Sequence, residues 1–594
     1  MPLSSRPVLL ACLLMCAVPA CVPSAPPRVS LDAATAVPDR CGVVFWVEGL
    51  DAVAFDALQR RGLLPNITRY LIDRGVRVQS GITSLPTITY ANNVSLSTGL
   101  LPGRHGIVGN KWFDRHSLIY QDYAFIKSYQ QVDHDFTAPT IYEQLHRDMT
   151  ATILTPIRRG VTRNVDNCIS AAVAWHFGLQ DLVNDLTTAR FELIADVANR
   201  AGRWPILVVA YYVAPDTIGH AAGVSGPEFE RALVNIDTQV GHVCASLEKA
   251  RLLDRTYVTL VSDHGFVDTP RHVSIGDVLR RHGIECRDAS FGRGLEFEKR
   301  LEHFDPARAV VIVNGDRQCT LHLRAGDHWW QRPTEQEIAR FLRTHGRPGN
   351  TPVRDAARGV LVAAATILPV NAEDQPDLPT MLARLEGVEL VTVHAGPGKV
   401  KVFSRDGIGL IERHKAPAEG TIGPDEGGLA GGHWLYSYSV LEGADPLGYR
   451  GTPAEALVGG QKNPADAWLA ATAQTGKPDV VVQLAEYHDS ARAGDVNLFA
   501  AEGWDFGRDN HGGHGGLLRR EIVVPWIIAG PDLPRGQTLP HARTVNLMPT
   551  MLELLGRRDS IPAGLDGVSI ADALRRAGQR QPATTTRPQG APAP

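Results

Sequence analysis

Residues 83–110 read Thr-Ser-Leu-Pro-Thr-Ile-Thr-Tyr-Ala-Asn-Asn-Val-Ser-Leu-Ser-Thr-Gly-Leu-Leu-Pro-Gly-Arg-His-Gly-Ile-Val-Gly-Asn. We interpret this stretch as the nucleophile segment of a hydrolase, with Thr89 as the attacking residue and a helix expected over 92–100. A threonine hydroxyl is a weak nucleophile at its ordinary pKa and needs a base or a metal ion before it attacks. The alternative is that Thr89 is only a structural helix cap. The hypothesis therefore requires metal ligands elsewhere in the chain.

Three continuous apolar runs, each followed by an acidic residue, predict the fold around this segment. Such runs are typical of strands buried on both faces of a parallel sheet. The runs are 43–47, 206–213 and 256–261, and the acids that follow them are Glu48, Asp216 and Asp263. Because the carboxyl ends of parallel strands meet at one edge of a sheet, we expect these carboxylates to share one site. The predicted fold class is α/β, a mostly parallel sheet sandwiched by helices, with a large inserted domain.

Histidines accompany the acids at the spacing of a metal site. His220 follows Asp216 by four residues, and His264 directly follows Asp263. His514 lies in a His-Gly-Gly-His-Gly-Gly stretch, in which His511 is the alternative ligand. Mixed Asp/His sets suit zinc, and two adjacent metal ions suit in-line displacement at phosphorus.

These motifs stand in the order in which the alkaline phosphatase superfamily has them. The chain resembles most closely its nucleotide pyrophosphatase/phosphodiesterase (type I phosphodiesterase) family. The nucleophile element matches Thr89–Asn92, Thr98–Gly99, Pro102 and His105–Asn110, and the ligand motifs match Asp216–His220, Asp263–Gly265 and His514. The matches span about residues 43–270 and 500–530. Each motif alone is weak evidence, but four in the family's order are a strong signal.

The resemblance implies two divalent metal ions. Zinc fits the Asp/His ligands best, and manganese and iron are the alternatives. The resemblance assigns one ion to Glu48, Asp263, His264 and the Thr89 oxygen, and the other to Asp216, His220 and His514. It also implies a phosphothreonine intermediate that is then hydrolysed. The family has aspartate where this chain has Glu48, whose carboxylate is one methylene further out, and Asp51 is the alternative ligand.

Two further residues acquire roles from the resemblance. Asn110 would donate its side-chain amide to a phosphoryl oxygen and stabilise developing charge. The alternative is an ordinary turn asparagine. Tyr90 stands where the family has phenylalanine, and its ring could stack on a nucleobase or another aromatic leaving group.

The resemblance implies hydrolysis of phosphodiester or nucleotide pyrophosphate bonds in a small-molecule substrate. One alternative is a phosphate monoesterase or phosphonate hydrolase, which needs extra cations, and Arg158, Arg159 and Arg163 are the candidate cluster. Another is a non-hydrolytic envelope protein that keeps the fold. The net charge of −4 gives no sign of a nucleic-acid-binding surface.

The 594 residues exceed what one hydrophobic core holds, so we expect several parts. They are a signal peptide over 1–21, a linker over 22–40, a catalytic core over 41–270 and 478–575, an inserted cap domain over 271–477 and a disordered tail over 576–594. We also expect a helix over 227–250, a short strand over 359–364 and a strand over 478–484 that returns to the sheet of the core. No catalytic motif appears within the cap domain. The apolar run before a small-residue cleavage site resembles a bacterial lipoprotein signal, with Cys21 acylated, although ordinary cleavage after Ala20 is the alternative. Export to the periplasm of a bacterium, with or without a lipid anchor, follows from this interpretation.

Overall fold

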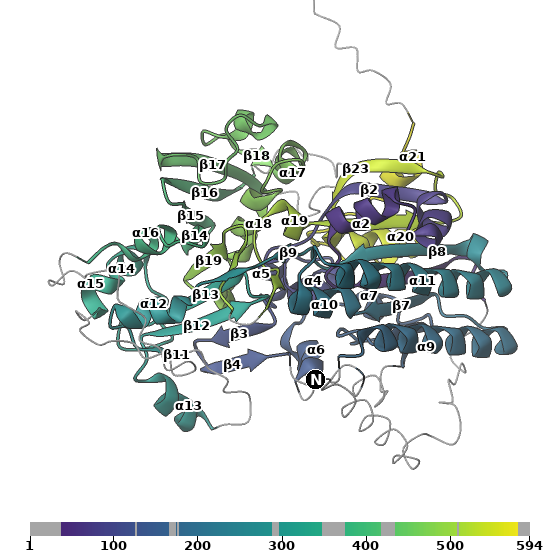
Figure 1. Cartoon of the computed structure of the whole chain (residues 1–594), viewed down its shortest axis with the longest axis horizontal. Helices are drawn as coiled ribbons and strands as arrows, with labels where there is room; N and C mark the ends of the chain where they lie inside the picture. The colour runs from purple at the N-terminus through teal and green to yellow at the C-terminus, as the bar shows by residue number, and fades with distance from the viewer. Residues whose placement is uncertain are drawn as a thin grey trace, which may run out of the picture.

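The computed structural model describes residues 37–124, 128–165, 174, 178–287, 296–346, 375–416, 434–507 and 510–579. Two large sheets dominate it, and Figure 1 shows them side by side, with the strands numbered β12 to β18 on the left. The expected signal peptide, most of the linker and residues 580–594 lie outside the described residues. None of the described helices is both long and apolar enough to cross a membrane.

The first sheet has eight strands in the order β23-β2-β22-β8-β1-β7-β5-β6. Their bounds are β1 Cys41–Val47, β2 Gly75–Ile82, β5 Thr150–Ile153, β6 Arg163–Asn164, β7 Leu207–Tyr212, β8 Thr256–Ser262, β22 Val523–Ala529 and β23 Gln537–Arg543. Only β22 runs antiparallel to its neighbours β2 and β8. The predicted α/β fold with a mostly parallel sheet is therefore confirmed, and its three apolar runs are the central strands β1, β7 and β8.

Both faces of the first sheet are covered by helices, because successive side chains of a strand point to opposite faces. Val43, Phe45 and Val47 of β1 pack into one core with helices α2 (Ala52–Arg60), α9 (Gln180–Ala201) and α11 (Pro227–Lys249). Val44 and Trp46 pack into the opposite core. The helices there are α4 (Thr89–Thr98), α7 (Ile141–Gln144), α20 (Leu547–Leu554) and α21 (Ala571–Arg576).

The second sheet has nine strands in the order β11-β12-β13-β19-β14-β15-β16-β17-β18. Their bounds are β11 Cys286–Arg287, β12 Ala309–Asn314, β13 Gln318–Leu323, β14 Val388–His394, β15 Lys399–Phe403, β16 Gly407–Lys415, β17 Trp434–Gly443, β18 Asn463–Pro464 and β19 Val496–Ala500. Most of it comes from 271–477, but β19 comes from the segment that we assigned to the second part of the core. The domain limits stay a prediction, and a strand expected over 359–364 lies outside the described residues.

One predicted strand was wrong. We expected the apolar run 478–484 to return to the first sheet, but it lies in helix α18 (Val480–Tyr487). All eight residues of α18 are buried, and they pack between the sheets against Ile82, Leu85 and Val400. A helix that is apolar on every side has no 3.6-residue pattern, so its sequence resembles that of a buried strand.

The remaining described α-helices and strands, with one π-helical turn, lie between and around the two sheets; several short 3-10 turns also occur. The helices, strands and π-helical turn are α3 Pro65–Ile67, the π-helical turn Thr68–Ile72, α5 Pro102–His105, β3 Lys111–Asp114, β4 Ile119–Asp122, α6 Val132–Asp135, α10 Ala214–Ala222, β9 Val267–Asp268, β10 Arg271–His272, α12 Ile275–Arg281, α13 Phe297–Phe304, α14 Glu335–Ala339, α15 Phe341–His345, α16 Leu378–Ala383, α17 Ala465–Thr472, β20 Trp504–Asp505, β21 Gly512–Gly513 and α19 Arg519–Ile522.

Candidate active site

The carboxyl ends of β1, β7 and β8 bring the predicted acids together. Val47 pairs with Tyr212 on one side and with Ser262 on the other, so the three strands end level with one another. Gly49 then takes a left-handed conformation with φ 70°. A Cβ atom at Gly49 would lie 2.8 Å from the Asp216 Cα, so only glycine permits this approach of the two strand ends.

Thr89 is the first residue of helix α4 and is buried. The helix begins three residues earlier than we expected, and Ile88 is its cap residue, so Thr89 does not act as the cap. The Thr89 hydroxyl lies 3.2 Å from the Nε2 atom of His264. The proposed nucleophile therefore faces the strand-end cluster from a helix N-terminus, where backbone N–H groups favour a phosphate.

Two overlapping groups of side chains could each hold a metal ion. Within each group, one potential ligand atom per residue lies within 4.8 Å of the others; the groups are Glu48, Asp263 and His264, and Asp216, His264 and His514. The predicted ligand His220 belongs to neither group, although its Nε2 atom lies 3.6 Å from Asp216 Oδ1. Glu48 Oε2, Asp216 Oδ1 and Asp263 Oδ2 are buried and have no hydrogen-bond partner among the described residues. Buried carboxylate oxygens are stable only when paired or bound to a metal, so this donor set fits divalent cations.

The three predicted histidines all present the same nitrogen to the cluster. Their Nδ1 atoms donate to backbone carbonyls: His220 to Gly512 at 3.0 Å, His264 to Gly265 at 3.1 Å and His514 to Thr87 at 2.7 Å. In His264 and His514 the Nε2 atom then keeps its lone pair, as a metal ligand requires. In His220 burial lowers the pKa, but the charges of Asp216 and Asp316 outweigh burial and raise the pKa to about 9, so this ring would release a proton on binding a metal. The Nε2 atoms lie 3.6, 3.8 and 3.6 Å from Asp216 Oδ1, in the same order.

The electrostatics of the cluster also favour bound cations. Burial and the neighbouring charges of Asp216 and Asp263 raise the pKa of Glu48 well above its usual value. Burial together with Asp216 raises the pKa of Asp263 in the same direction. Burial lowers the pKa of His264 to about 3, so this imidazole is neutral at physiological pH. Divalent cations would stabilise the ionised carboxylates and leave neutral imidazoles as ligands.

The structure distinguishes the preferred ligands, Glu48 and His514, from their alternatives, Asp51 and His511, by their contacts and burial. The Asp51 carboxylate accepts from Val53 N and Ala54 N as the cap of α2 and pairs with Arg520 at 2.7 Å. His511 is exposed, whereas His514 is buried and stacks on His264 with ring centroids 3.6 Å apart. Glu48 and His514 therefore fit the cluster better than Asp51 and His511.

Asn110 and Tyr90 lie beside the nucleophile. The Asn110 Oδ1 atom accepts from the backbone N–H of Tyr90 at 3.0 Å, so the amide NH₂ is the end of the side chain that can donate to a ligand. The Tyr90 hydroxyl donates to the Tyr123 carbonyl at 3.2 Å, and the two rings are 5.0 Å apart. His105 is buried against Ser95 and Ile107 N and orders the loop between them.

Two of the three arginines that we considered for a monoester, Arg158 and Arg159, are engaged with neighbouring acids and carbonyls, and the third, Arg163, donates to the Thr162 carbonyl. Arg159 donates to Glu143 at 3.1 Å and to the carbonyls of Asp133, Phe136 and Ala138. Arg158 lies 3.8 Å from the Asp133 carboxylate. These contacts fix the segment from Asp133 to Glu143 and give both guanidinium groups a structural role.

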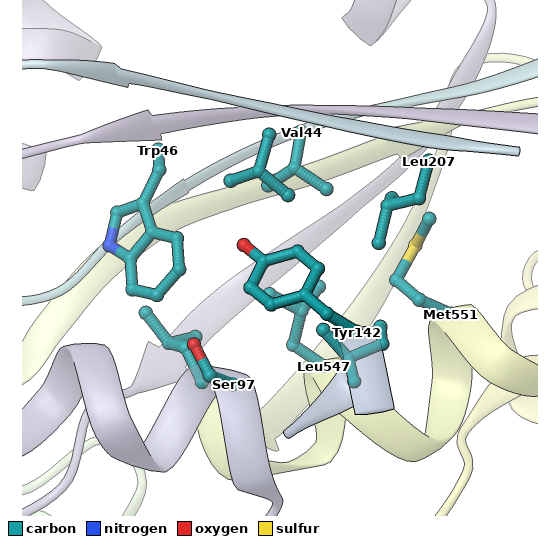
Figure 2. Close-up of a pocket in the computed structure, with 10 residues that line it drawn as sticks. Val44, Trp46, Ser97, Tyr142, Leu207, Leu547 and Met551 are labelled. Atoms are coloured by element: carbon teal, nitrogen blue, oxygen red, sulfur yellow. The ribbon is translucent and has the colours of Figure 1, made fainter. Parts of the chain in front are cut away.

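A small cavity lies behind the nucleophile helix and not at the strand ends. Figure 2 shows it between the sheet residues Val44, Trp46 and Leu207 and the helix residues Ser97 and Met551. Its volume of about 20 Å³ is that of a single water molecule, and the candidate ligands do not line it. Sequence reasoning gave no signal for this cavity, which is a packing feature of the core.

The fold and the cluster define the class: an alkaline-phosphatase-like α/β protein whose sheet carries candidate metal ligands at its strand ends. The family model "Type I phosphodiesterase / nucleotide pyrophosphatase" matches residues 44–347, half of the chain. The chain therefore belongs to the type I phosphodiesterase/nucleotide pyrophosphatase family, as the motifs predicted.

Two relatives that are similar in sequence carry names of the same family. An uncharacterized pyrophosphatase/phosphodiesterase of Schizosaccharomyces pombe is 28% identical over 303 residues, which cover 48% of this chain and 56% of the relative. The human ectonucleotide pyrophosphatase/phosphodiesterase family member 5 is 27% identical over 201 residues, 33% of this chain and 39% of the relative. The chain thus spans about half the length of these relatives.

The structure of murine ectonucleotide pyrophosphatase/phosphodiesterase 5, an inactive variant in complex with AMP, is similar with a TM-score of 0.51 and 14% identity. The match covers 91% of this chain and 100% of the murine one. At this identity the likeness shows the fold, and it extends the comparison beyond the segment that the family model matches.

Proposed function

We propose that the chain is a two-metal hydrolase of phosphodiester or nucleotide pyrophosphate bonds that acts through a phosphothreonine intermediate. One observation carries the proposal: the buried Thr89 hydroxyl lies 3.2 Å from His264, at the edge of a cluster of unpartnered carboxylate oxygens and aligned Nε2 atoms. That arrangement combines a candidate nucleophile with the groups that activate it.

The candidate ligands divide between two ions. Glu48, Asp263, His264 and the Thr89 oxygen would hold one, and Asp216, His220 and His514 the other. When bound, the ions supply Lewis-acid stabilisation of the phosphoryl oxygens and lower the pKa of the attacking groups. Zinc fits these Asp/His ligands.

In the first step Thr89 Oγ loses its proton to solvent and forms a bond to phosphorus, while the bond to the leaving oxygen breaks. The leaving oxygen takes a proton from solvent. In the second step a water oxygen attacks phosphorus, the Oγ–P bond breaks and Thr89 regains a proton. The Asn110 amide donates to a non-bridging oxygen in both steps.

The substrate class follows from the ring of Tyr90 and from the arginines. The Tyr90 ring, held against Tyr123, offers a stacking surface beside the nucleophile for a nucleobase or aromatic ester. AMP in the murine relative's structure supports a nucleotide 5′-ester. Because Arg158 and Arg159 already have carboxylate and carbonyl partners, neither supports a monoesterase.

A chromogenic ester panel tests the proposal. The purified protein is stripped of metal with a chelator and assayed with bis-p-nitrophenyl phosphate before and after zinc is restored. We expect hydrolysis that disappears on stripping and returns with zinc. Full hydrolysis by the stripped protein, or none by the zinc-loaded protein with any phosphate ester, would refute a metal-dependent hydrolase.

We further propose that the protein is exported and anchored by a lipid on Cys21 in the periplasm of a bacterium. The support is the apolar run 7–19 followed by Ala20 and Cys21. Labelling expressing cells with radioactive palmitate tests it. Label on the wild-type protein and none on the Cys21→Ala variant is expected, and an unlabelled wild-type protein would exclude the anchor.

A further inference from the structure

The tip of the β12–β13 hairpin, residues 314–317, reaches from the second sheet into the candidate active site. The sequence has no catalytic motif between 271 and 477, yet this turn contacts four parts of the site. Its backbone is unusual, because Asp316 has φ 66°, a left-handed conformation that is uncommon for residues other than glycine. The turn therefore holds Asp316 in one specific place.

Asn314, Gly315 and Arg317 of this turn form hydrogen bonds with segments next to the proposed catalytic groups. The Asn314 side chain accepts from Lys111 N at 2.9 Å and donates to Lys111 O at 3.0 Å, one residue after Asn110. The Gly315 carbonyl accepts from His514 N at 2.8 Å, and Arg317 N donates to His514 O at 3.1 Å. The hairpin tip is thus hydrogen-bonded along the backbone of His514.

The close approach of the hairpin tip to His514 depends on glycine at position 315. A Cβ atom on Gly315 would lie 2.6 Å from the His514 carbonyl oxygen and 2.8 Å from Cε1 of its ring. Arg317 adds a buried ion pair to Glu521 at 2.8 Å, and the Glu521 carbonyl accepts from Gly265, next to His264. The second sheet is therefore joined to the segment that carries His514 and, through Glu521, to the loop that carries His264.

Asp316 itself faces a candidate ligand. Its Oδ2 atom lies 3.4 Å from Nδ1 of His220 and accepts from the Asn510 amide. The opposite ring nitrogen of His220, Nε2, lies 3.6 Å from Asp216 Oδ1. A carboxylate behind a histidine fixes the ring and strengthens it as a ligand. The Nδ1 atom of His220 has two oxygen neighbours. The Gly512 carbonyl, at 3.0 Å, is the closer hydrogen-bond acceptor, and the Asp316 carboxylate, at 3.4 Å, supplies the negative charge.

We propose that Asp316 is a positioning residue for His220, so that the second sheet completes the ion site formed by Asp216, His220 and His514. The inference rests on the proposed function, because it concerns that same site. The other ligand group, Glu48, Asp263 and His264, follows strands β1 and β8 of the first sheet. Loss of the Asp316 carboxylate should therefore weaken one ion site and leave the other intact.

Zinc binding to the stripped Asp316→Asn protein tests the proposal. Binding is measured by competition with a chromophoric chelator, together with the thermal unfolding midpoint of the metal-free protein. We expect two ions in the wild type, and in the variant one site weakened about 10- to 100-fold, the usual effect of removing a carboxylate behind a ligand. The second site should not change, and the metal-free variant should still unfold in one cooperative transition.

The matched control is Asp406→Asn, the same chemical change at an exposed position in the turn between β15 and β16. It should bind both ions as the wild type does. If Asp316→Asn does not fold, Asn510→Ala removes the amide that holds the Asp316 carboxylate, and a smaller loss at the same single site is expected.

The outcomes separate the two proposals. A wild-type protein that binds no zinc would refute the proposed function. A wild-type protein with two ions, combined with unchanged affinities in Asp316→Asn or, failing that, in Asn510→Ala, would overturn the positioning role alone. Equal weakening of both sites would also overturn it, because the effect would then be a general one on the fold.

Discussion

Glu48 is the residue at which this chain departs from its family's aspartate. Its carboxylate follows β1, is buried, and has one oxygen without a partner in the described part of the chain. Asp51, the nearby acid that could have replaced it, caps helix α2 instead. The longer side chain therefore still lies where a strand-end ligand is needed.

Substitution of Glu48 tests this placement. Glu48→Gln keeps the size but removes the charge, so the variant should lose metal and activity together. Glu48→Asp keeps the charge at a shorter reach and should retain some of both. Elemental analysis of the purified variants measures the metal. Two ions per chain in Glu48→Gln would show that the residue is not a ligand.

Residue types and order were enough to predict most of the candidate cluster. Asp216, Asp263 and their histidines follow apolar strands, and such strand ends must meet at one edge of a parallel sheet. Asp316 could not be predicted, because it lies in an ordinary hairpin turn distant in sequence from His220. Only the packing of one sheet on the other brings the two side chains together.

Among the elements, the hairpin tip depends on the buried pair of Arg317 and Glu521. Both side chains are fully buried, and Arg317 also donates to the carbonyls of Ala500 and Ala501. Glu521 accepts in turn from Gly516 N at 2.7 Å. Burying two charges is favourable only while each keeps its partner.

Removal of one partner should therefore destabilise the protein strongly. For Glu521→Leu we expect a loss of about 3–5 kcal/mol in the free energy of unfolding, because a buried guanidinium is left unpaired. Urea denaturation followed by circular dichroism measures it. The double variant Arg317→Met/Glu521→Leu should recover part of the loss, and a single variant as stable as the wild type would contradict this account.

Helix α18 shows why one element was mispredicted. The run Val480–Tyr487 contains three consecutive valines and is buried on every side, so neither propensity nor periodicity distinguishes a helix from a strand. The deciding contacts are tertiary: its neighbours come from both sheets, and Gly103 closely approaches the Glu486 carbonyl. Elements that face solvent on one side, such as α11, were predicted closely.

At the scale of the whole molecule, the two sheets meet around one site. The first sheet supplies the strand-end candidate ligands, and the second supplies the hairpin tip that contacts the candidate ligands His220 and His514. The interpretation of 271–477 as a cap domain could not predict the contact between the hairpin tip and the candidate site. The apolar pattern of a strand shows that the strand is buried, but it does not show which sheet or helix the strand packs against.

The preference between phosphodiesters and phosphate monoesters depends on the charges of the whole site. We expect a higher kcat/KM for bis-p-nitrophenyl phosphate than for p-nitrophenyl phosphate, because a monoester dianion carries one more charge and needs an extra cation. Steady-state assays of the zinc-loaded protein measure both values. The opposite ranking, together with its collapse in an Arg158→Ala/Arg159→Ala variant, would indicate a monoesterase built on the same cluster.

Mass spectrometry of an acid-quenched reaction tests the central claim most directly, because a phosphothreonine is stable in acid. The zinc-loaded protein is mixed with excess bis-p-nitrophenyl phosphate, quenched during turnover and digested. We predict that Thr89 carries the p-nitrophenyl phosphoryl group that remains after one p-nitrophenolate has departed. The folded Thr89→Ala variant should show neither this modification nor turnover. An unmodified Thr89 combined with near-normal turnover of Thr89→Ala would contradict the account.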